Sequence, residues 1–316
     1  MDANNFVPIR VSTLRGENAI TFDAYVRVAG KFILYCRKGD TFEGQRLKRL
    51  KEKKLKKMFI LQDHEGNYRS YLTSNIEQAY DKNSGKSIED RSQVIQGAQQ
   101  AAAEDVMENP ESQEFYQVAK IGAGKYVDFI LKEAEAVKSI LAIENTDASV
   151  GHHGVTVGAV AVAIAEQLGM SDRYPMDLLT MGCLLHDFDH MTNGLSVGRN
   201  KKDLNTDEIR IFNEHPRAAV EKVKHLKHFD NLVLKIILQH EECIDGSGVP
   251  NGLKEKDVEP LAVLCATANS YDKYVSFMKL EPKEALKTML VDKMGLHPLS
   301  HLQALQAVLK EKKVLA

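Results

Sequence analysis

The chain has 316 residues, and its 42 Lys and Arg residues against 44 Asp and Glu residues give a formal net charge of −2 at pH 7. This near-balance argues against a nucleic-acid-binding protein that relies on bulk positive charge. A hydrophobic fraction of 43% and a charged fraction of 27% are typical of globular chains and exclude disordered, collagen-like and membrane-embedded classes. Because the N-terminal sequence MDANNFVPIR lacks an apolar signal core, we expect a cytoplasmic protein with neither nucleic acid nor membrane as a partner.

Residues 1–80 have the mixed pattern of a small α+β domain. Two β-type runs within residues 22–37 meet near Gly30 and predict a hairpin. Apolar spacing and turn residues then predict, in chain order, a helix over 43–57, a short strand over 58–62, a turn over 63–67 and a helix over 68–80.

Residues 81–145 predict a helical linker between two domains. Its first ten residues are polar, and helical composition then dominates from residue 92 to residue 143. Asn109-Pro110 predicts a break within this helical stretch, because proline lacks the backbone N–H that a helix interior needs.

Residues 146–316 have the pattern of an all-α domain, with apolar residues at helical spacing and no β-type alternation. Asn205 followed by Glu208 predicts a helix start with a capping box, and Pro216 is predicted to divide that helix from the next. The other predicted helices cover residues 153–168, 177–186, 231–241 and 261–274. The expected fold class is therefore multidomain, with a small α+β N-terminal domain, a helical linker and an all-α C-terminal domain.

The histidines are concentrated in this C-terminal part, since eight of the eleven fall between residues 152 and 240. One histidine on an apolar helix face is more often a satisfied core residue than a metal ligand. Several imidazoles on successive buried helices are costly without partners, and a metal ion supplies one. Four predicted helices carry such side chains on the apolar face or at its end: His153, His186-Asp187, His215 and His240-Glu241.

The adjacent pair His186-Asp187 is the most informative of these. Its carboxylate can bridge two metals while the neighbouring imidazole binds one of them. Two metals roughly 3.5–4 Å apart activate water and hold a phosphate group. Mixed imidazole and carboxylate ligands suit Fe, Mn or Zn.

This series of motifs, followed by the loop sequence DGSGVP at residues 245–250, resembles the HD-GYP branch of the HD phosphohydrolase superfamily. The resemblance covers residues 150–310 and implies an all-α fold, a two- or three-metal centre of iron or manganese, and hydrolysis of cyclic di-GMP. By position it implies that His153, His186 and Asp187 hold one metal and that Asp187, His215 and His240 hold the second. Asp187 would then be the bridging and catalytic residue.

The sequence departs from the family at three metal positions. Glu241 replaces the second histidine of a His-His pair and can still bind through oxygen. Asn269 replaces the aspartate that completes the first metal, and an amide oxygen is a weaker, neutral ligand. Ser149 replaces a glutamate that serves a third metal in some members, so we expect two divalent metals, Fe or Mn, with Zn as the alternative.

The substrate side departs further. His190 stands where the family has a phosphate-binding lysine, and Val249 replaces the tyrosine of the GYP motif. The expected arginine falls at Met278, with Lys279 next to it as a partial substitute, so His190 and Lys279 are the candidate substrate-binding residues. Each lost contact costs on the order of 1–3 kcal/mol of binding.

These departures leave rival hypotheses of different classes. The leading one is a binuclear metal-dependent phosphodiesterase that acts on or binds cyclic di-GMP. The alternative is a catalytically weakened, metal-containing sensor or protein-interaction module, for which the resemblance implies a signalling partner of the GGDEF type. A third hypothesis is hydrolysis of another phosphoester, such as a nucleotide, at the same metals.

Overall fold

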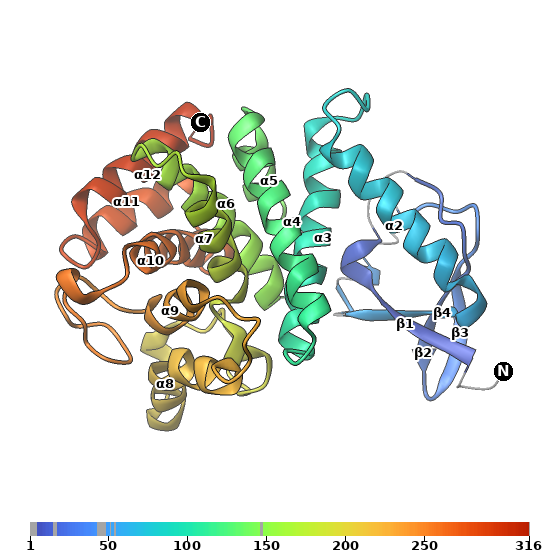
Figure 1. Cartoon of the computed structure of the whole chain (residues 1–316), viewed down its shortest axis with the longest axis horizontal. Helices are drawn as coiled ribbons and strands as arrows, with labels where there is room; N and C mark the ends of the chain where they lie inside the picture. The colour runs from blue at the N-terminus through green and yellow to red at the C-terminus, as the bar shows by residue number, and fades with distance from the viewer. Residues whose placement is uncertain are drawn as a thin grey trace. The chain divides into compact units, whose positions relative to one another are not determined.

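The structure, a computed structural model, describes residues 5–14, 18–42, 49–50, 52–53, 55–145 and 148–315. It divides into two compact units, Met1–Ala101 and Ala102–Ala316, which are drawn with their elements in Figure 1. Each unit has its own secondary structure and core.

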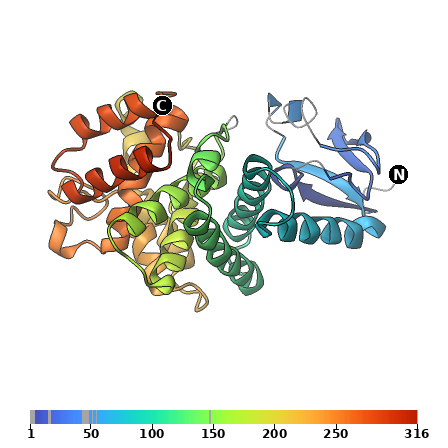
Figure 2. The ribbon, with the colours of Figure 1, turned by 90° about the horizontal axis from the view of Figure 1, so that it is seen from above.

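The N-terminal unit is an antiparallel sheet with a long helix beside it. The strands are β1 (Phe6–Arg10), β2 (Ala24–Val28), β3 (Lys31–Cys36) and β4 (Lys57–Leu61), in the order β1-β4-β2-β3. Helix α2 (Glu65–Tyr80) lies along the sheet (Figure 2) and packs Tyr71 edge-on against the buried ring of Phe22. The core between them consists of apolar side chains from every strand, which is what alternating strand patterns produce.

The hairpin predicted near Gly30 is confirmed. Ala29 and Gly30 both have positive φ, 48° and 80°, as the two-residue turn that matches strand twist requires. The strand predicted over residues 58–62 is also confirmed as β4, whereas β1 was not predicted. The turn predicted over 63–67 is confirmed only as far as His64, in the 3₁₀ turn Gln62–His64, because α2 begins at Glu65.

Most of the helix predicted over 43–57 lies outside the described residues. In the described parts, residues 49–50 are helical and residue 57 already belongs to β4.

The C-terminal unit is helical. Helix α3 (Ile88–Glu108) leads into it, and the predicted break at Asn109-Pro110 separates α3 from α4 (Gln113–Lys132). The remaining helices are α5 (Ala136–Leu141), α6 (Val150–Gln167), α7 (Arg173–Leu185), α8 (Thr206–Val223), α9 (Asn231–Gln239), α10 (Pro260–Asp272), α11 (Pro282–Asp292) and α12 (Leu299–Glu311).

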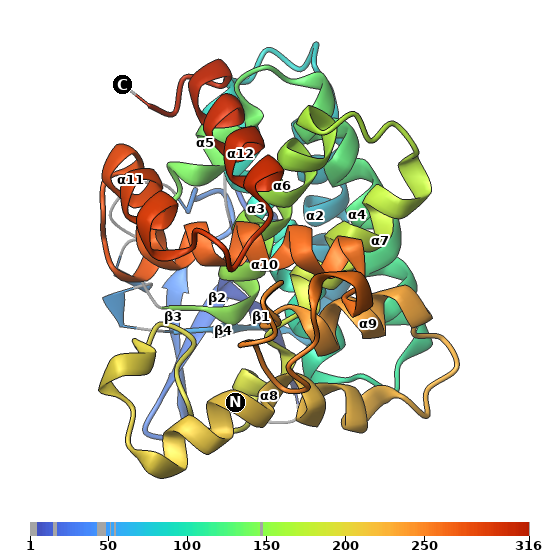
Figure 3. The same ribbon diagram turned by 90° about the vertical axis from the view of Figure 1, so that its left-hand side faces the viewer.

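Helix α6 is the centre of this unit, because every residue from Val150 to Ala165 is buried. A helix that is apolar on all sides belongs in a core, and α4, α5, α7, α10 and α12 all contact it. Figure 3 shows α10 crossing the unit, with α11 and α12 on one side and α8 and α9 on the other. This arrangement brings α6, α7, α8 and α9 together at one place, where their histidines meet.

The prediction that Pro216 divides a helix is wrong, since α8 runs unbroken from Thr206 to Val223. A proline inside a helix leaves the carbonyl four residues earlier without its usual partner. Here that carbonyl, on Phe212, accepts a hydrogen bond from His215 Nδ1 at 2.6 Å instead. The capping box of Asn205 and Glu208 at the start of α8 is confirmed.

Among the helices of the described part of the chain, none is both long enough and apolar enough to cross a bilayer.

Candidate metal centre

Four imidazoles from four helices meet around one carboxylate in the C-terminal unit. The imidazoles are those of His153 on α6, His186 at the end of α7, His215 on α8 and His240 at the end of α9. The carboxylate is that of Asp187, which follows His186, and all five side chains are buried. Asp187 Oδ2 lies 3.5 Å from His153 Nε2 and 3.2 Å from His186 Nε2. Asp187 Oδ1 lies 3.3 Å from His215 Nε2 and 3.4 Å from His240 Nε2. The two carboxylate oxygens therefore face two different pairs of imidazoles, and each set of three can hold a metal ion.

Close helix packing makes this convergence possible. A Cβ atom on Gly154, next to His153, would lie 2.8 Å from the carbonyl oxygen of Leu184 on α7. A Cβ atom on Gly182 would lie 2.5 Å from the Ile236 side chain on α9. Glycine at these positions lets α6 and α9 approach α7 near its histidine-bearing end.

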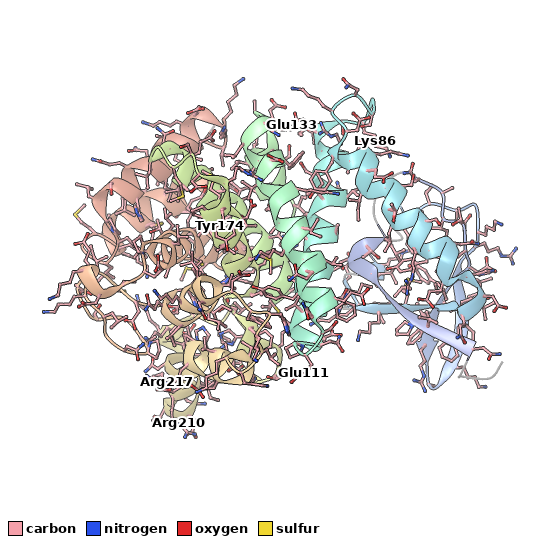
Figure 4. All side chains as sticks on the ribbon, in the orientation of Figure 1. Lys86, Glu111, Glu133, Tyr174, Arg210 and Arg217 are labelled. Atoms are coloured by element: carbon pink, nitrogen blue, oxygen red, sulfur yellow. The ribbon has the colours of Figure 1, made fainter. Side chains whose placement is uncertain are left out.

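Only one face of helix α8 is directed at the metal centre. His215 is fully buried, whereas Arg210 and Arg217 lie at the outer surface of the same helix (Figure 4). This division between a polar and an apolar face is typical of an amphipathic helix, and it aims the single buried imidazole at Asp187.

The imidazoles are held so that Nε2 is the free atom. In each of three histidines, Nδ1 donates to the backbone carbonyl three residues earlier, which can only accept. A metal-binding imidazole is commonly oriented in this way by a bond at its other nitrogen. The three bonds are from His186 to Cys183 at 2.7 Å, from His215 to Phe212 at 2.6 Å and from His240 to Ile237 at 2.8 Å.

The fourth imidazole is held by a carboxylate. His153 Nδ1 lies 2.5 Å from Asp272 Oδ2, and Asp272 Oδ1 accepts a hydrogen bond from Ser276 at 2.8 Å. A carboxylate behind an imidazole fixes its orientation and raises its basicity as a metal ligand. His153 Nε2 is thereby turned toward Asn269 Oδ1, 3.0 Å away.

The donor set fits a divalent metal. His186 Nε2 and both oxygens of Asp187 are buried and have no hydrogen-bond partner within the described residues. His215 Nε2 and His240 Nε2 lie 3.1 Å apart, although each ring already carries its proton on Nδ1, so two lone pairs face one another. Buried polar atoms in this state are costly unless a cation lies among them.

The charges within the centre stabilise one another. Burial opposes the ionisation of Asp187, but its contacts with His186, His215 and His240 outweigh burial and hold the pKa of Asp187 well below its usual value. Burial likewise opposes the charge on His186, but Asp187 beside it raises the pKa of His186 to about 9, so a metal that binds Nε2 must displace a proton from it. Burial lowers the pKa of His240 to about 4. The buried carboxylate is thus ionised, as a metal ligand must be.

Glu241 and Asn269, the two expected replacement ligands, are also brought to the centre. Glu241 Oε1 lies 3.9 Å from His240 Nε2, but it accepts hydrogen bonds from Lys273 at 2.6 Å and from Asn269 Nδ2 at 3.1 Å. Burial opposes the charge on Glu241, yet the ammonium of Lys273 outweighs it and lowers the pKa of that carboxyl. Glu241 is therefore shared between the centre and Lys273.

A cavity of about 330 Å³ opens beside the centre. Its walls combine His240, Glu241 and Asn269 of the centre with basic and aromatic side chains. Positive charge and aromatic faces are the groups that bind phosphates and bases. Those walls include Arg199, Lys201, Lys273, Lys293, Phe212, Tyr274 and Phe277.

The residues at the altered substrate positions have different environments. Val249 and Met278 line the cavity. Lys279 instead forms an ion pair with Glu144, at 3.6 Å, and both side chains are more than half exposed. The side chain of His190 is buried beside Asp187, where burial lowers its pKa to about 4, so its imidazole does not supply the positive charge of a lysine.

Asp272 and Lys273 were not predicted from the sequence. Asp272 follows Asn269 by three residues on α10, so both lie on the same helix face, and that spacing was a usable signal. Lys273 belongs to the π-helical turn Lys273–Phe277. Nothing in the sequence predicted that turn, which directs the lysine to Glu241.

We expect Asp272→Asn to weaken metal binding by about 10- to 100-fold, as losses of orienting partners do. A neutral amide is a poorer acceptor for His153 Nδ1 and adds no negative charge behind the ring. Titration against a competing chelator measures the effect. The matched control is Asp292→Asn, which alters a carboxylate that accepts from Tyr274 at 3.0 Å. Equal affinity in both variants would contradict the assigned role of Asp272.

Comparison with known proteins defines the class. The pattern of the family described as HD domain matches residues 136–295, about half of the chain, and the protein belongs to this family. A solved structure, Bd1817, an HDG"Y"P protein from Bdellovibrio bacteriovorus, is 49% identical with a TM-score of 0.92, covering 96% of this chain and 99% of that chain. The predicted HD-GYP membership and multidomain fold class are confirmed.

Curated relatives resemble a little under half of the chain. The cyclic di-GMP phosphodiesterase PA4108 of Pseudomonas aeruginosa is 28% identical over 46% of this chain and 35% of that relative. The cyclic di-GMP phosphodiesterase response regulator RpfG of Xanthomonas campestris is 31% identical over 43% of this chain and 36% of that relative. The matched region thus spans about a third of the length of these curated relatives.

Proposed function

We propose that the protein is a binuclear metal-dependent phosphodiesterase of the HD-GYP type that acts on cyclic di-GMP. The observation that carries this proposal is the carboxylate of Asp187, buried without hydrogen-bond partners in the described part of the chain, with each oxygen facing its own pair of imidazoles. The names of the curated relatives support the choice of substrate.

In this proposal, Asp187, His153, His186 and Asn269 would hold one metal. Asp187, His215 and His240 would hold the second, with Glu241 beside it. Iron or manganese is expected, with zinc as the alternative, because these metals accept mixed nitrogen and oxygen ligands. When bound, two such metals lower the pKa of water and neutralise charge that develops on a phosphodiester.

The chain itself supplies binding and orientation. Lys201 and Lys293 are basic side chains of the cavity wall, where they would attract the phosphates of a dinucleotide. Asp187 would position the attacking water relative to the phosphorus. Lys273 is already neutralised by Glu241 at 2.6 Å, so it contributes less charge to the substrate than its position suggests.

The alternative function is a metal-containing sensor or interaction module with weak catalysis and a signalling partner such as a GGDEF protein. A specific observation favours it, namely that none of the altered substrate positions offers its family chemistry. His190 is neutral and buried, Val249 lacks an aromatic ring, and Lys279 is paired with Glu144. Each of these losses removes a contact with substrate while leaving the metal ligands intact.

One experiment separates the two functions. The protein is purified anaerobically, its metal content is measured, and turnover of cyclic di-GMP is assayed after loading with Fe, Mn or Zn. About two metals per chain with turnover supports the phosphodiesterase. Two metals without turnover under any loading, together with binding of the dinucleotide or a partner, supports the alternative. A chain that binds no metal contradicts both.

A further inference from the structure

His190 stands where the family has a substrate-binding lysine, but its surroundings are those of a metal ligand. It belongs to the short 3₁₀ turn Phe188–Met191, in which its backbone N–H bonds to the carbonyl of Asp187 at 2.9 Å. Side chains three residues apart nearly eclipse one another in such a turn. The imidazole therefore lies on the same side as the Asp187 carboxylate, with Nε2 3.9 Å from Oδ1.

The protonation of the ring is fixed from behind. His190 Nδ1 lies 3.0 Å from the carbonyl oxygen of Leu195, which can only accept, so Nδ1 carries the proton. This is the arrangement of His186, His215 and His240, whose Nδ1 atoms also donate to backbone carbonyls. His190 Nε2 thus keeps its lone pair and lies 3.9 Å from the same carboxylate oxygen that His215 and His240 approach at 3.3 and 3.4 Å.

The ring is also turned away from the substrate cavity. Its side chain is 3% exposed, and among the described residues that line the cavity His190 does not appear. It packs instead against the His215 ring, with 4.4 Å between centroids and 32° between planes. An imidazole in this place is much shorter than a lysine and remains at the centre.

We propose that His190 is a third imidazole ligand of the metal held by Asp187 Oδ1, His215 and His240. This inference rests on the proposed metal centre and deepens it. The second site would then have three imidazoles and one carboxylate, whereas the first has two imidazoles, a carboxylate and the Asn269 amide. Imidazole-rich sites favour Zn and Fe, and oxygen-rich sites suit Mn. Histidine in place of the family's lysine would thus remove a contact with substrate and would make the second site prefer Zn or Fe over Mn.

Nitrogen-15 spectra of the full chain loaded with ¹¹³Cd test this directly. Each coordinated Nε2 shows a one-bond coupling to cadmium, and we expect that coupling at His190 as well as at His215 and His240. The His190→Lys variant identifies the resonance. Coupling at His215 and His240 with none at His190 would overturn the inference and leave the proposed centre standing. Absence of bound cadmium altogether would count against the centre itself.

Metal titrations give a second readout that does not need the spectra. We expect His190→Gln and His190→Lys to bind the tighter of two Zn ions, the one held by three imidazoles and a carboxylate, at least tenfold less tightly than the wild type. The preference for Zn over Mn at that site should fall in parallel. The control is His301→Gln, which removes an imidazole that bonds to Thr267 on α10. Unchanged affinities in both His190 variants, or tighter binding of cyclic di-GMP by His190→Lys with unchanged metal binding, would refute a ligand role.

Discussion

Asp187→Ala is expected to abolish both turnover of cyclic di-GMP and the binding of both metals. One side chain serves two sites, since its Oδ2 faces His153 and His186 while its Oδ1 faces His215 and His240. Alanine leaves the first site with neutral donors only and the second with Glu241, whose charge Lys273 already offsets at 2.6 Å. A buried divalent charge needs a carboxylate to offset it. Metal content after dialysis against iron, manganese or zinc measures the loss.

The same variant should lose the stabilisation that metals confer. A ligand at 100 times its Kd stabilises the folded state by about 2.7 kcal/mol per site. Two sites therefore raise the melting temperature of a unit of this size by roughly 10–20 °C. We expect this rise in the wild type after metal addition and no rise in Asp187→Ala, as measured by thermal unfolding with and without chelator.

Asp230→Ala is the matched control. Asp230 is also a partly buried carboxylate, but it pairs with Lys120 at 2.8 Å and with the Tyr116 hydroxyl at 3.0 Å, away from the centre. Its loss should lower stability by about 1.5–3 kcal/mol and leave the metal-dependent rise intact. A metal-dependent rise that persists in Asp187→Ala would show that the ions bind elsewhere.

The main part of the centre was predictable because its pattern is local. Imidazoles on the apolar faces of successive helices must meet in the core, and an adjacent His-Asp pair at a helix end marks their meeting point. The sequence therefore identified His153, His186, Asp187, His215 and His240, which the structure brings together.

Other features depend on tertiary contacts that no local pattern contains. The π-helical turn after α10 directs Lys273 to Glu241. Lys279 forms an ion pair with Glu144 instead of lining the cavity. The helix break predicted at Pro216 was wrong because the His215 imidazole donates a hydrogen bond to the Phe212 carbonyl, which the proline leaves without a backbone donor. Strand β1 is only five residues long, and its pairing with β4 joins segments about 50 residues apart.

The second large effect is expected at Gly154, where helix packing and ligand geometry are linked. Its backbone is helical, so alanine suits the conformation itself. The added Cβ would meet the carbonyl oxygens of Leu184 and Cys183 at 2.8 and 2.9 Å. These are backbone atoms that cannot turn aside, so α6 and α7 must separate, at a cost of about 1–3 kcal/mol for overpacking.

Gly158, one helical turn further along α6, provides the control. A Cβ there would have no neighbour closer than 3.8 Å, so Gly158→Ala should stabilise the protein by about 0.5–1 kcal/mol through its higher helix propensity. Urea unfolding of the chelator-treated proteins should therefore show that Gly154→Ala lowers the free energy of unfolding and that Gly158→Ala raises it, although both substitutions are glycine to alanine. Gly154→Ala should also bind metal less tightly, because the affected carbonyl of Cys183 orients His186 and Gly154 adjoins His153. If both variants were equally stable and equally metal-competent, the close approach of α6 and α7 would have no part in assembling the centre.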